Sequence, residues 1–439
     1  MNSRSRKLVK YVVPTILSSL SIFLFSIIDG IFVGRGVGSD ALGAVNLAFP
    51  FIMIFNALVM LFTIGGLTIT AIRYGRNDEK GANQAFMHSI VMAGLISAVF
   101  ALAGLFLTRP LLRLMGASEY FMDQASDYLF WYAVFMLPCG LYYGLNGFVR
   151  TDGDPVLVSA SVIISSGLNI VLDWLFIFPL KMGLKGAAIA TGLAQLAGFF
   201  VVLIHFFKKK GILRFRPQPF DKRLMKLILL RGLPECIAQF GVPLTTIIMN
   251  TLLTSYIGET AVNVYSILAY TASFAVSIFM GTAEGIQPLF GISYGAKDEE
   301  DLKFYLRAGL WISFVGSTFI TLAVILLRAP ICTLFGAEGV TRQMTIEAMP
   351  LYAWGFIIES VNVIISGYLY STTRTRQALI ANVLRSLVFN SLVTILMPKL
   401  FGPQSLWLTF GVYEILVLIV SVILLKRADK NGAIQGDNE

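Results

Sequence analysis

The sequence predicts an all-α integral membrane protein with twelve transmembrane helices, arranged as two parallel-repeat six-helix bundles. Three observations predict this fold class. Of the 439 residues, 56% are hydrophobic and 13% are charged, with a mean hydropathy of +0.76, whereas a soluble domain carries about 25% charged residues. Apolar runs long enough to span a bilayer recur along the chain, and the second half repeats the first. This composition excludes soluble enzymes, nucleic-acid-binding proteins and disordered chains.

A helix needs about 20 apolar residues to cross a bilayer. Helices are expected because in lipid each span must satisfy its own backbone hydrogen bonds. The longer runs predict tilted or kinked helices. Reading the apolar runs between charged or Gly/Pro-rich breaks gives twelve candidate spans, at residues 10–34, 40–72, 84–107, 121–149, 156–178, 184–207, 225–256, 260–292, 303–327, 342–371, 377–397 and 405–425.

The basic residues predict the orientation of these spans. With the N-terminus inside, 26 of the 34 Lys and Arg residues fall on the inner side and eight on the outer side. Cytoplasmic loops carry such an excess, so both termini are expected in the cytoplasm. The formal charge of +9 is therefore a signal of topology, and no nucleic-acid partner is expected.

The two halves match at a constant offset of 220 positions, for example Gly65 with Gly285 and Tyr74-Gly75 with Tyr294-Gly295. This duplication predicts an N-terminal bundle at 1–207, a basic cytoplasmic linker at 208–224, and a C-terminal bundle with a short cytoplasmic tail at 225–439. Six spans per half make the repeat parallel. Paired bundles around a central site are a recurring design of secondary transporters. A channel or a structural membrane protein is the alternative.

Ionisable side chains inside spans are costly and point to function. Five acids lie in predicted spans, and their counterparts in the other half are not acidic where the repeat can be followed. The scaffold therefore repeats while the acids do not. Glu414 is expected to serve as a pairing residue, whereas Glu284 and Glu359 either contact a cationic substrate or stabilise bent helices. The five acids are Asp29, Asp173, Glu284, Glu359 and Glu414.

Counting residues from the span ends places Asp29, Asp173, Thr191 and Asn46 at one level, in the outer half of the N-terminal bundle. Asn169 lies four residues before Asp173 and so shares its helix face. These oxygens suit a hard cation such as Na⁺, with Asp29 and Asp173 as metal ligands. Alternatively, the two carboxyls share a proton. A third interpretation places Asp29 at the wet interface and gives Asp173 a structural hydrogen bond.

Other chemistry is not indicated. Three dispersed cysteines form no disulfide or zinc pattern, and no phosphate-binding loop occurs. No enzyme activity and no cofactor besides the coupling ion is expected. We assign no function to His88 and His205, which lie near the inner interface. Methionine and aromatic side chains adapt to varied cargo. The candidate residues of a substrate cavity are Glu284, Glu359, Asn46, Tyr142, Met53 and Phe274.

Four segments resemble the MATE (multidrug and toxic compound extrusion) transporters, and the likeness covers the whole chain. IDGIFVGRGVGSDALGAVN at 28–46 resembles the first signature of that family. GTAEGIQPLFGISYGAKDEE at 281–300 is similar to its motif at the end of span 8. GLNIVLDWLFIF at 167–178 and KGAAIATGLAQ at 185–195 resemble its fifth and sixth spans. The subgroup is similar to the bacterial MepA and DinF types.

The resemblance implies a monomeric antiporter of two bundles in the lipid bilayer that exports organic cations or other amphipathic compounds in exchange for H⁺ or Na⁺. The family's cation-site residues carry over onto Asp29, Asn169, Asp173 and Thr191. Glu359 falls where some members carry an acidic ligand. The acid that another subgroup has midway along span 7 is absent from PECIAQFGVPL at 234–244. A flippase for a lipid-linked or other amphipathic metabolite is the alternative function.

Overall fold

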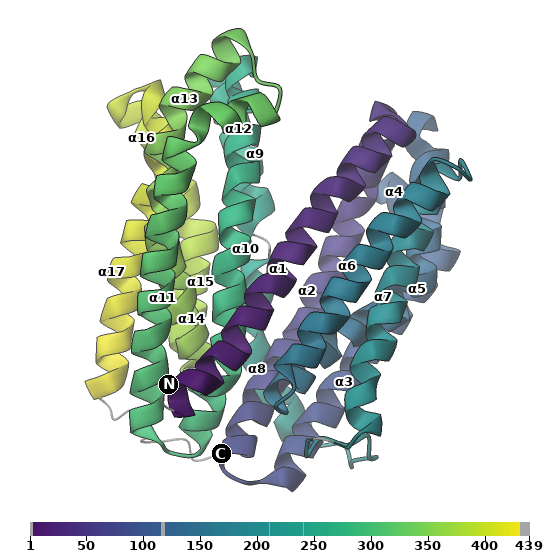
Figure 1. The fold of residues 1–439 in the computed structure, drawn as a ribbon, viewed down its shortest axis with the longest axis vertical. Helices are drawn as coiled ribbons and strands as arrows, with labels where there is room; N and C mark the ends of the chain where they lie inside the picture. The colour runs from purple at the N-terminus through teal and green to yellow at the C-terminus, as the bar shows by residue number, and fades with distance from the viewer. Residues whose placement is uncertain (1–2, 116–118, 210, 240, 431–439) are drawn as a thin grey trace. The chain divides into compact units, whose positions relative to one another are not determined.

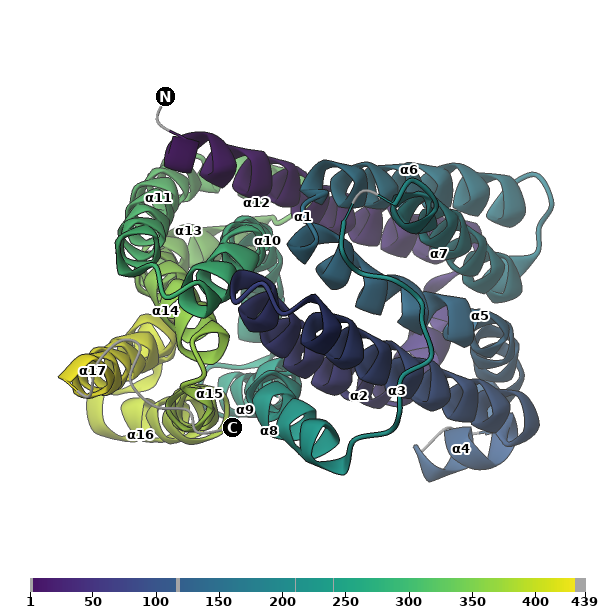
Figure 2. The ribbon, with the colours of Figure 1, turned by 90° about the horizontal axis from the view of Figure 1, so that it is seen from below.

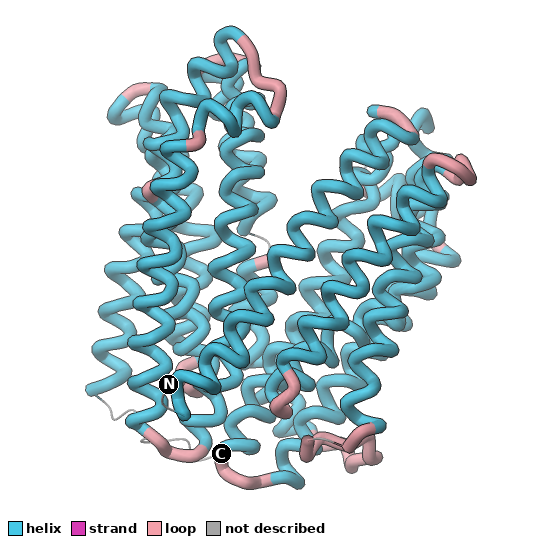
Figure 3. The backbone as a smooth tube through the Cα atoms, viewed as in Figure 1, coloured by secondary structure: helices cyan, strands magenta, loops and turns pink. Residues whose placement is uncertain are grey.

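The computed structural model describes residues 3–115, 119–209, 211–239 and 241–430. Within these ranges the chain is almost entirely helical and contains no strand, as the tube in Figure 3 shows. This confirms the predicted all-α class. The chain forms two compact units. We call Val9–Cys236 the N-terminal unit, and Met1–Leu8 together with Ile237–Glu439 the C-terminal unit.

The N-terminal unit is built from eight helices among the described residues. Helices α5, α6 and α7 pack together, and α2 and α3 pack on each other and on α5; Figure 2 shows α6 beside α7 and α2 beside α3. Figure 1 labels the helices in chain order. Their bounds are α1 Ser3–Gly36, α2 Ser39–Gly75, α3 Glu79–Phe106, α4 Thr108–Leu114, α5 Glu119–Thr151, α6 Pro155–Ile177, α7 Gly183–Phe207 and α8 Lys222–Ala238.

The C-terminal unit is centred on three helices that pack on one another, α10, α11 and α14, and α17 packs against α14. A core cluster of this unit includes the fully buried Trp407. The bounds are α9 Gly241–Tyr256, α10 Glu259–Gly295, α11 Glu299–Leu326, α12 Arg328–Leu334, α13 Gly339–Ala353, α14 Gly355–Ser371, α15 Thr375–Val383, the π-helix η1 Leu384–Phe389, α16 Asn390–Phe401, the 3-10 helix η2 Pro403–Leu408 and α17 Thr409–Lys430.

Eleven helical segments in the described chain are long and apolar enough to cross a membrane. The predicted seventh span, 225–256, corresponds to α8, with 17 residues, and α9, with 16, and residue 240 between these two helices lies outside the described residues. Each helix alone is too short to be counted, and the predicted twelve-helix class is confirmed. The predicted tenth span is interrupted at Trp354, between α13 and α14, and the predicted eleventh span contains the π-helix η1 between α15 and α16.

The repeat is visible in the local geometry of both halves. Asp78 accepts a hydrogen bond from the amide of Gly81 at 2.9 Å and starts α3, and Asp298 accepts one from Asp301 at 2.9 Å and starts α11. The residues just before these caps, Asn77 and Lys297, have positive φ angles of 59° and 57°. Matching residues therefore produce matching turns, because a side-chain oxygen at the N-cap satisfies a free amide of the first helical turn.

Helix α8 departs from the repeat in its packing. Although it begins the second copy, Leu224, Ile228 and Cys236 belong to a core cluster formed with α2 and α3 of the N-terminal unit. Two glycines allow the backbones of α2 and α8 to approach. A Cβ added to Gly232 would lie 1.7 Å from the carbonyl oxygen of Leu61, and one added to Gly65 would lie 2.0 Å from that of Ile228. By contact, residues 208–236 therefore group with the first half.

Replacement of Gly232 by alanine is expected to destabilise the protein by at least about 1–3 kcal/mol, because the new methyl group overlaps the backbone of α2 and forces the helices apart. The change is measured as a fall in melting temperature of the purified protein in detergent. Gly167→Ala in α6 is the matched control, since no atom lies within 4 Å of an added Cβ there. Equal melting temperatures for the two variants would contradict the close packing of α8 on α2.

Candidate cation site

Four polar residues of the N-terminal unit lie on three helices: Asp29 on α1, Asn169 and Asp173 on α6, and Thr191 on α7. Helices α6 and α7 pack along their lengths, and this contact brings Asn169 to Thr191. The amide Nδ2 of Asn169 donates a hydrogen bond to Thr191 Oγ1 at 3.2 Å. The amide oxygen of Asn169 is thereby turned away from the threonine and left available.

The site is poor in donors and rich in buried acceptors. Asp173 is fully buried and Asn169 is 2% exposed, while Asp29 is half-buried. Four oxygen atoms are buried without a hydrogen-bond partner: Asp173 Oδ1 and Oδ2, Asn169 Oδ1 and Asp29 Oδ1. A buried polar atom without a partner costs about 1–3 kcal/mol and more when it is charged. This arrangement therefore has unused capacity for a positive charge.

The two carboxyl groups face each other across α1 and α6, and their side chains interact directly. Two carboxylates have only acceptor oxygens, so neither can donate a hydrogen bond to the other. Either a proton on one of them or a cation between them satisfies both. Oxygen ligands of this kind, two carboxylates with an amide, are those that hard cations prefer. The geometry is thus compatible with H⁺ and with Na⁺.

Tyr128 of α5 is a further residue of this site that the sequence did not indicate. It is half-buried, interacts electrostatically with both Asp29 and Asp173, and lies against Tyr132 with ring centroids 6.0 Å apart. The chain has 16 tyrosines, and nothing in the local pattern of span 4 distinguishes this one. Only the packing of α5 against the other helices selects it.

The predicted cavity residues divide between the two units. In the N-terminal unit, Asn46 is exposed on α2 and Met53 is half-buried, whereas Tyr142 is 4% exposed with its hydroxyl 3.3 Å from Ser161 Oγ. In the C-terminal unit, Phe274 of α10 is 39% exposed and Glu284 is half-buried. Their role as a substrate cavity stays a prediction.

Glu359 belongs to a buried ion-pair network of the C-terminal unit. Arg385 Nη2 donates to Glu359 Oε1 at 2.8 Å, and its Nε donates to Glu414 Oε1 at 2.8 Å. Asn362 Nδ2 donates to Glu414 Oε2 at 2.7 Å. The pairing role expected for Glu414 is confirmed. Arg385 thus pairs with both glutamates. The second oxygen of Glu359, Oε2, is buried without a hydrogen-bond partner.

Replacement of Arg385 by methionine is expected to lower the free energy of unfolding by about 3–5 kcal/mol, because it leaves two buried carboxylates without their cation. Thermal melting of the purified variant measures the loss. Lys303→Met is the matched control: Lys303 pairs with Glu299 at 2.9 Å, but the two side chains are 63% and 47% exposed, and such pairs contribute little. Equal losses in both variants would contradict the structural importance of the network.

Comparison with known proteins adds an independent line of evidence. The MatE family model matches the chain twice, at residues 14–175 and 234–396, and the starts of the two matches reproduce the repeat offset of the sequence. The probable multidrug resistance protein YoeA of Bacillus subtilis is 26% identical over 366 residues, which cover 80% of this chain and 78% of YoeA. The multidrug export protein MepA of Staphylococcus haemolyticus is 24% identical, covering 95% of this chain and 91% of MepA.

Solved structures share the fold. One, described as the outward-facing conformation of a multidrug resistance MATE family transporter, has a TM-score of 0.91 at 23% identity, covering 98% of this chain and 97% of that one. A mutant of the Vibrio cholerae MATE transporter VcmN has a TM-score of 0.91 at 21% identity and covers 98% of both chains. These likenesses establish the architecture of twelve membrane helices.

Proposed function

Because the chain belongs to the MatE family, we propose that it is a secondary active antiporter that exports organic cations or other amphipathic drugs in exchange for H⁺ or Na⁺ by alternating access. It is a multi-pass membrane protein of a transporter family. Two relatives are named for multidrug resistance or multidrug export, which supports drugs as the substrate class. The family is one of transporters and not of enzymes, so we propose no catalytic residues.

The observation that carries this proposal is the set of four unpartnered acceptor oxygens on Asp29, Asn169 and Asp173. Each is buried, and together they leave a cation as the simplest group that satisfies them. A proton would join the two carboxyls, and Na⁺ would be held by carboxylate and amide oxygens as transported cargo. Thr191 would act as a positioning residue, because its hydroxyl fixes the orientation of the Asn169 amide.

Ion binding would act on transport through helix α1. Asp29 lies on α1 and Asp173 lies on α6. An ion that bridges the two carboxylates would therefore change the interaction between these two helices. A ligand can shift a conformational equilibrium only if it binds the two states with different affinity. We propose that the outward-open state binds the ion more tightly, and that occupancy favours release of the drug on the outer side.

Acidic side chains in the spans support cationic cargo. Glu284 lies in α10 of the C-terminal unit, whereas Glu359 in α14 is already paired with Arg385 through Oε1 and could offer a cation only its second oxygen, Oε2. Met53, Phe274, Tyr142 and Asn46 would contribute adaptable surface. We further propose that the protein works as a monomer in the bacterial cytoplasmic membrane, with both termini cytoplasmic, with lipid and small-molecule substrates as its partners, and with no cofactor besides the coupling ion.

Replacement of Asp29 or Asp173 by asparagine is expected to reduce ion-driven drug export to background while the protein still inserts into the membrane, since the amide cannot bind H⁺ or Na⁺ as a carboxylate does. Export of a cationic dye is measured in liposomes with proton and sodium gradients imposed separately, which also identifies the ion. Asp123→Asn is the control, because Asp123 is exposed and paired with Arg109 at 2.6 Å. Full export by both site variants would overturn the assignment.

Thr191→Val is expected to raise the ion concentration for half-maximal transport about tenfold, with a smaller effect on the maximal rate. The valine keeps the shape of threonine but leaves Asn169 Nδ2 without its acceptor, and the loss of such a hydrogen bond costs about 1–1.5 kcal/mol. Thr191→Ser keeps the hydroxyl and is expected to transport like the unchanged protein. A Thr191→Val variant with unchanged ion dependence would remove this hydrogen bond from the site.

A further inference from the structure

Residues 211–221 precede α8 and lie within the predicted basic cytoplasmic linker, 208–224. In the structure, side chains of the N-terminal unit bind their backbone at residues 212–214 and 221. Asp152, in the turn between α5 and α6, accepts hydrogen bonds from the amide of Ile212 at 2.8 Å through Oδ1 and from the amide of Leu213 at 3.1 Å through Oδ2. One carboxylate thus satisfies two main-chain donors of a segment that has no helix or strand.

Asn83 of α3 also forms hydrogen bonds with the backbone of residues 212–214. Its Nδ2 donates to the carbonyl of Ile212 at 2.9 Å, and its Oδ1 accepts from the amide of Arg214 at 2.6 Å. Three consecutive residues therefore make four main-chain hydrogen bonds to two side chains. Leu213 between them is fully buried in a core cluster, and the ring of Phe215 lies 4.5 Å from that of Phe206.

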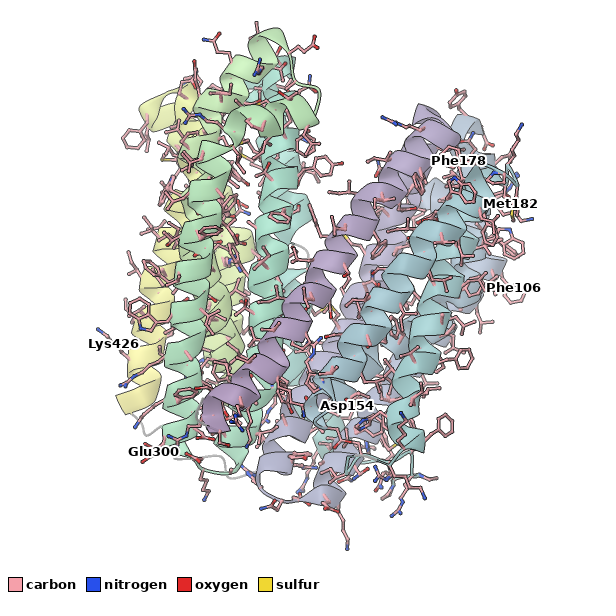
Figure 4. The ribbon with its side chains drawn as sticks, viewed as in Figure 1. Phe106, Asp154, Phe178, Met182, Glu300 and Lys426 are labelled. Atoms are coloured by element: carbon pink, nitrogen blue, oxygen red, sulfur yellow. The ribbon has the colours of Figure 1, made fainter. Side chains whose placement is uncertain are left out.

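Two further side chains form a cluster with Asp152. His205 Nε2 of α7 lies 2.9 Å from Asp152 Oδ2, and both side chains are fully buried. Asp154 Oδ2 lies 3.5 Å from the other ring nitrogen. Figure 4 labels Asp154 at one end of α6 and Phe178 at the opposite end, so this cluster and the carboxyl of Asp173 are near opposite ends of the bundle. His205, to which we assigned no function from the sequence, thus contacts the carboxylate that binds the linker.

The far end of the segment is held by His88 of α3. Its Nδ1 lies 2.8 Å from the carbonyl of Gln84, and its Nε2 lies 2.9 Å from the amide of Asp221. Because an amide can only donate, Nε2 is the acceptor and the ring proton is on Nδ1. The Asp221 carboxylate accepts from the amides of Leu224 and Arg223; these bonds lower the pKa of Asp221 and cap the start of α8.

We propose that residues 211–221 form a strap that fixes α8 to the N-terminal unit, so that α8 moves with that unit although it belongs to the second copy of the repeat. The strap is bound at 212–214 and at 221, and α8 continues from it directly onto the glycine contact with α2. The strap and the packing thus place α8 on the same unit. The relevance to transport rests on the proposed function, whereas the attachment itself does not.

Hydrogen exchange of the full-length protein in detergent tests the attachment. Asp152→Ala removes two acceptors, so exchange of the amides of Ile212 and Leu213 is expected to rise at least about tenfold. Asp152→Asn, which keeps the shape of the side chain, is expected to give a smaller rise. Asp123→Ala, at an exposed acid, is the control and is expected to leave these amides unchanged. Exchange at 212–214 that stays within about twofold in the alanine variant would overturn the strap.

A spin-label distance between α8 and α3 tests whether the strap fixes the helix. Leu230 and Val91 are 50% and 49% exposed, and cysteines at these positions carry the labels in a variant without the three native cysteines. We expect one narrow distance distribution that is the same with and without drug, and a broadened one after Asp152→Ala. A His88→Leu variant is expected to broaden it too, whereas His88→Gln, which retains an acceptor, is expected to restore it.

A distribution that changes on drug addition, or one that stays narrow in the Asp152→Ala and His88→Leu variants, would overturn the proposal. Neither readout requires transport, so failure of the strap is distinguishable from failure of the Asp29 and Asp173 assignment. If the strap holds, Asp152→Ala is also expected to lower the rate of drug export in liposomes about three- to tenfold. The same variant should leave the ion dependence unchanged, because Asp152 lies outside the cation site.

Discussion

The constraint on which this structure depends is the cost of an unsatisfied polar group in lipid. In a bilayer no water replaces a missing hydrogen bond, so each span satisfies its own backbone and most side chains are apolar. The few ionisable side chains that remain must find partners within the protein. Arg385 shows the outcome where partners exist, because its guanidinium joins Glu359 and Glu414, and Asn362 satisfies the second oxygen of Glu414.

Against this constraint, Asp29, Asn169 and Asp173 differ as a group, since four of their acceptor oxygens are buried in one site without a hydrogen-bond partner, whereas Glu359 leaves a single oxygen unpaired. The free energy of this site is high without a cation and falls when a cation binds. An ion-coupled transporter requires such a change in free energy on ion binding. The asymmetry between the halves follows the same logic. The C-terminal unit carries its own arginine among its acids, whereas among the described residues of the N-terminal site no basic side chain pairs with Asp29 or Asp173.

The internal repeat explains why the two halves share local structure, but it does not explain why their tertiary contacts and their ionisable side chains differ. Matching caps at Asp78 and Asp298, and short helices at α4 and α12, show that equivalent residues fold in equivalent ways. Helix α8 does not follow this rule, because Gly232 and the strap attach it to the first half. A duplicated chain can thus keep its local structure while its tertiary contacts cross the boundary between the copies.

The sequence by itself determined the helical class, nearly all of the spans and the repeat, because these depend on the lengths of apolar runs and on residue identity at a fixed offset. It also predicted Asp29, Asp173 and Thr191 at one level, because depth along a helix is set by counting residues, and it placed Asn169 on the same helix face as Asp173. The rotation of each helix about its axis was decided only by tertiary packing. Packing placed Tyr128 near Asp29 and Asp173, left Asn46 exposed and brought Arg385 to Glu359 and Glu414. Packing also bound residues 212–214 to Asp152 and Asn83, since contacts between distant segments leave no local pattern in the chain.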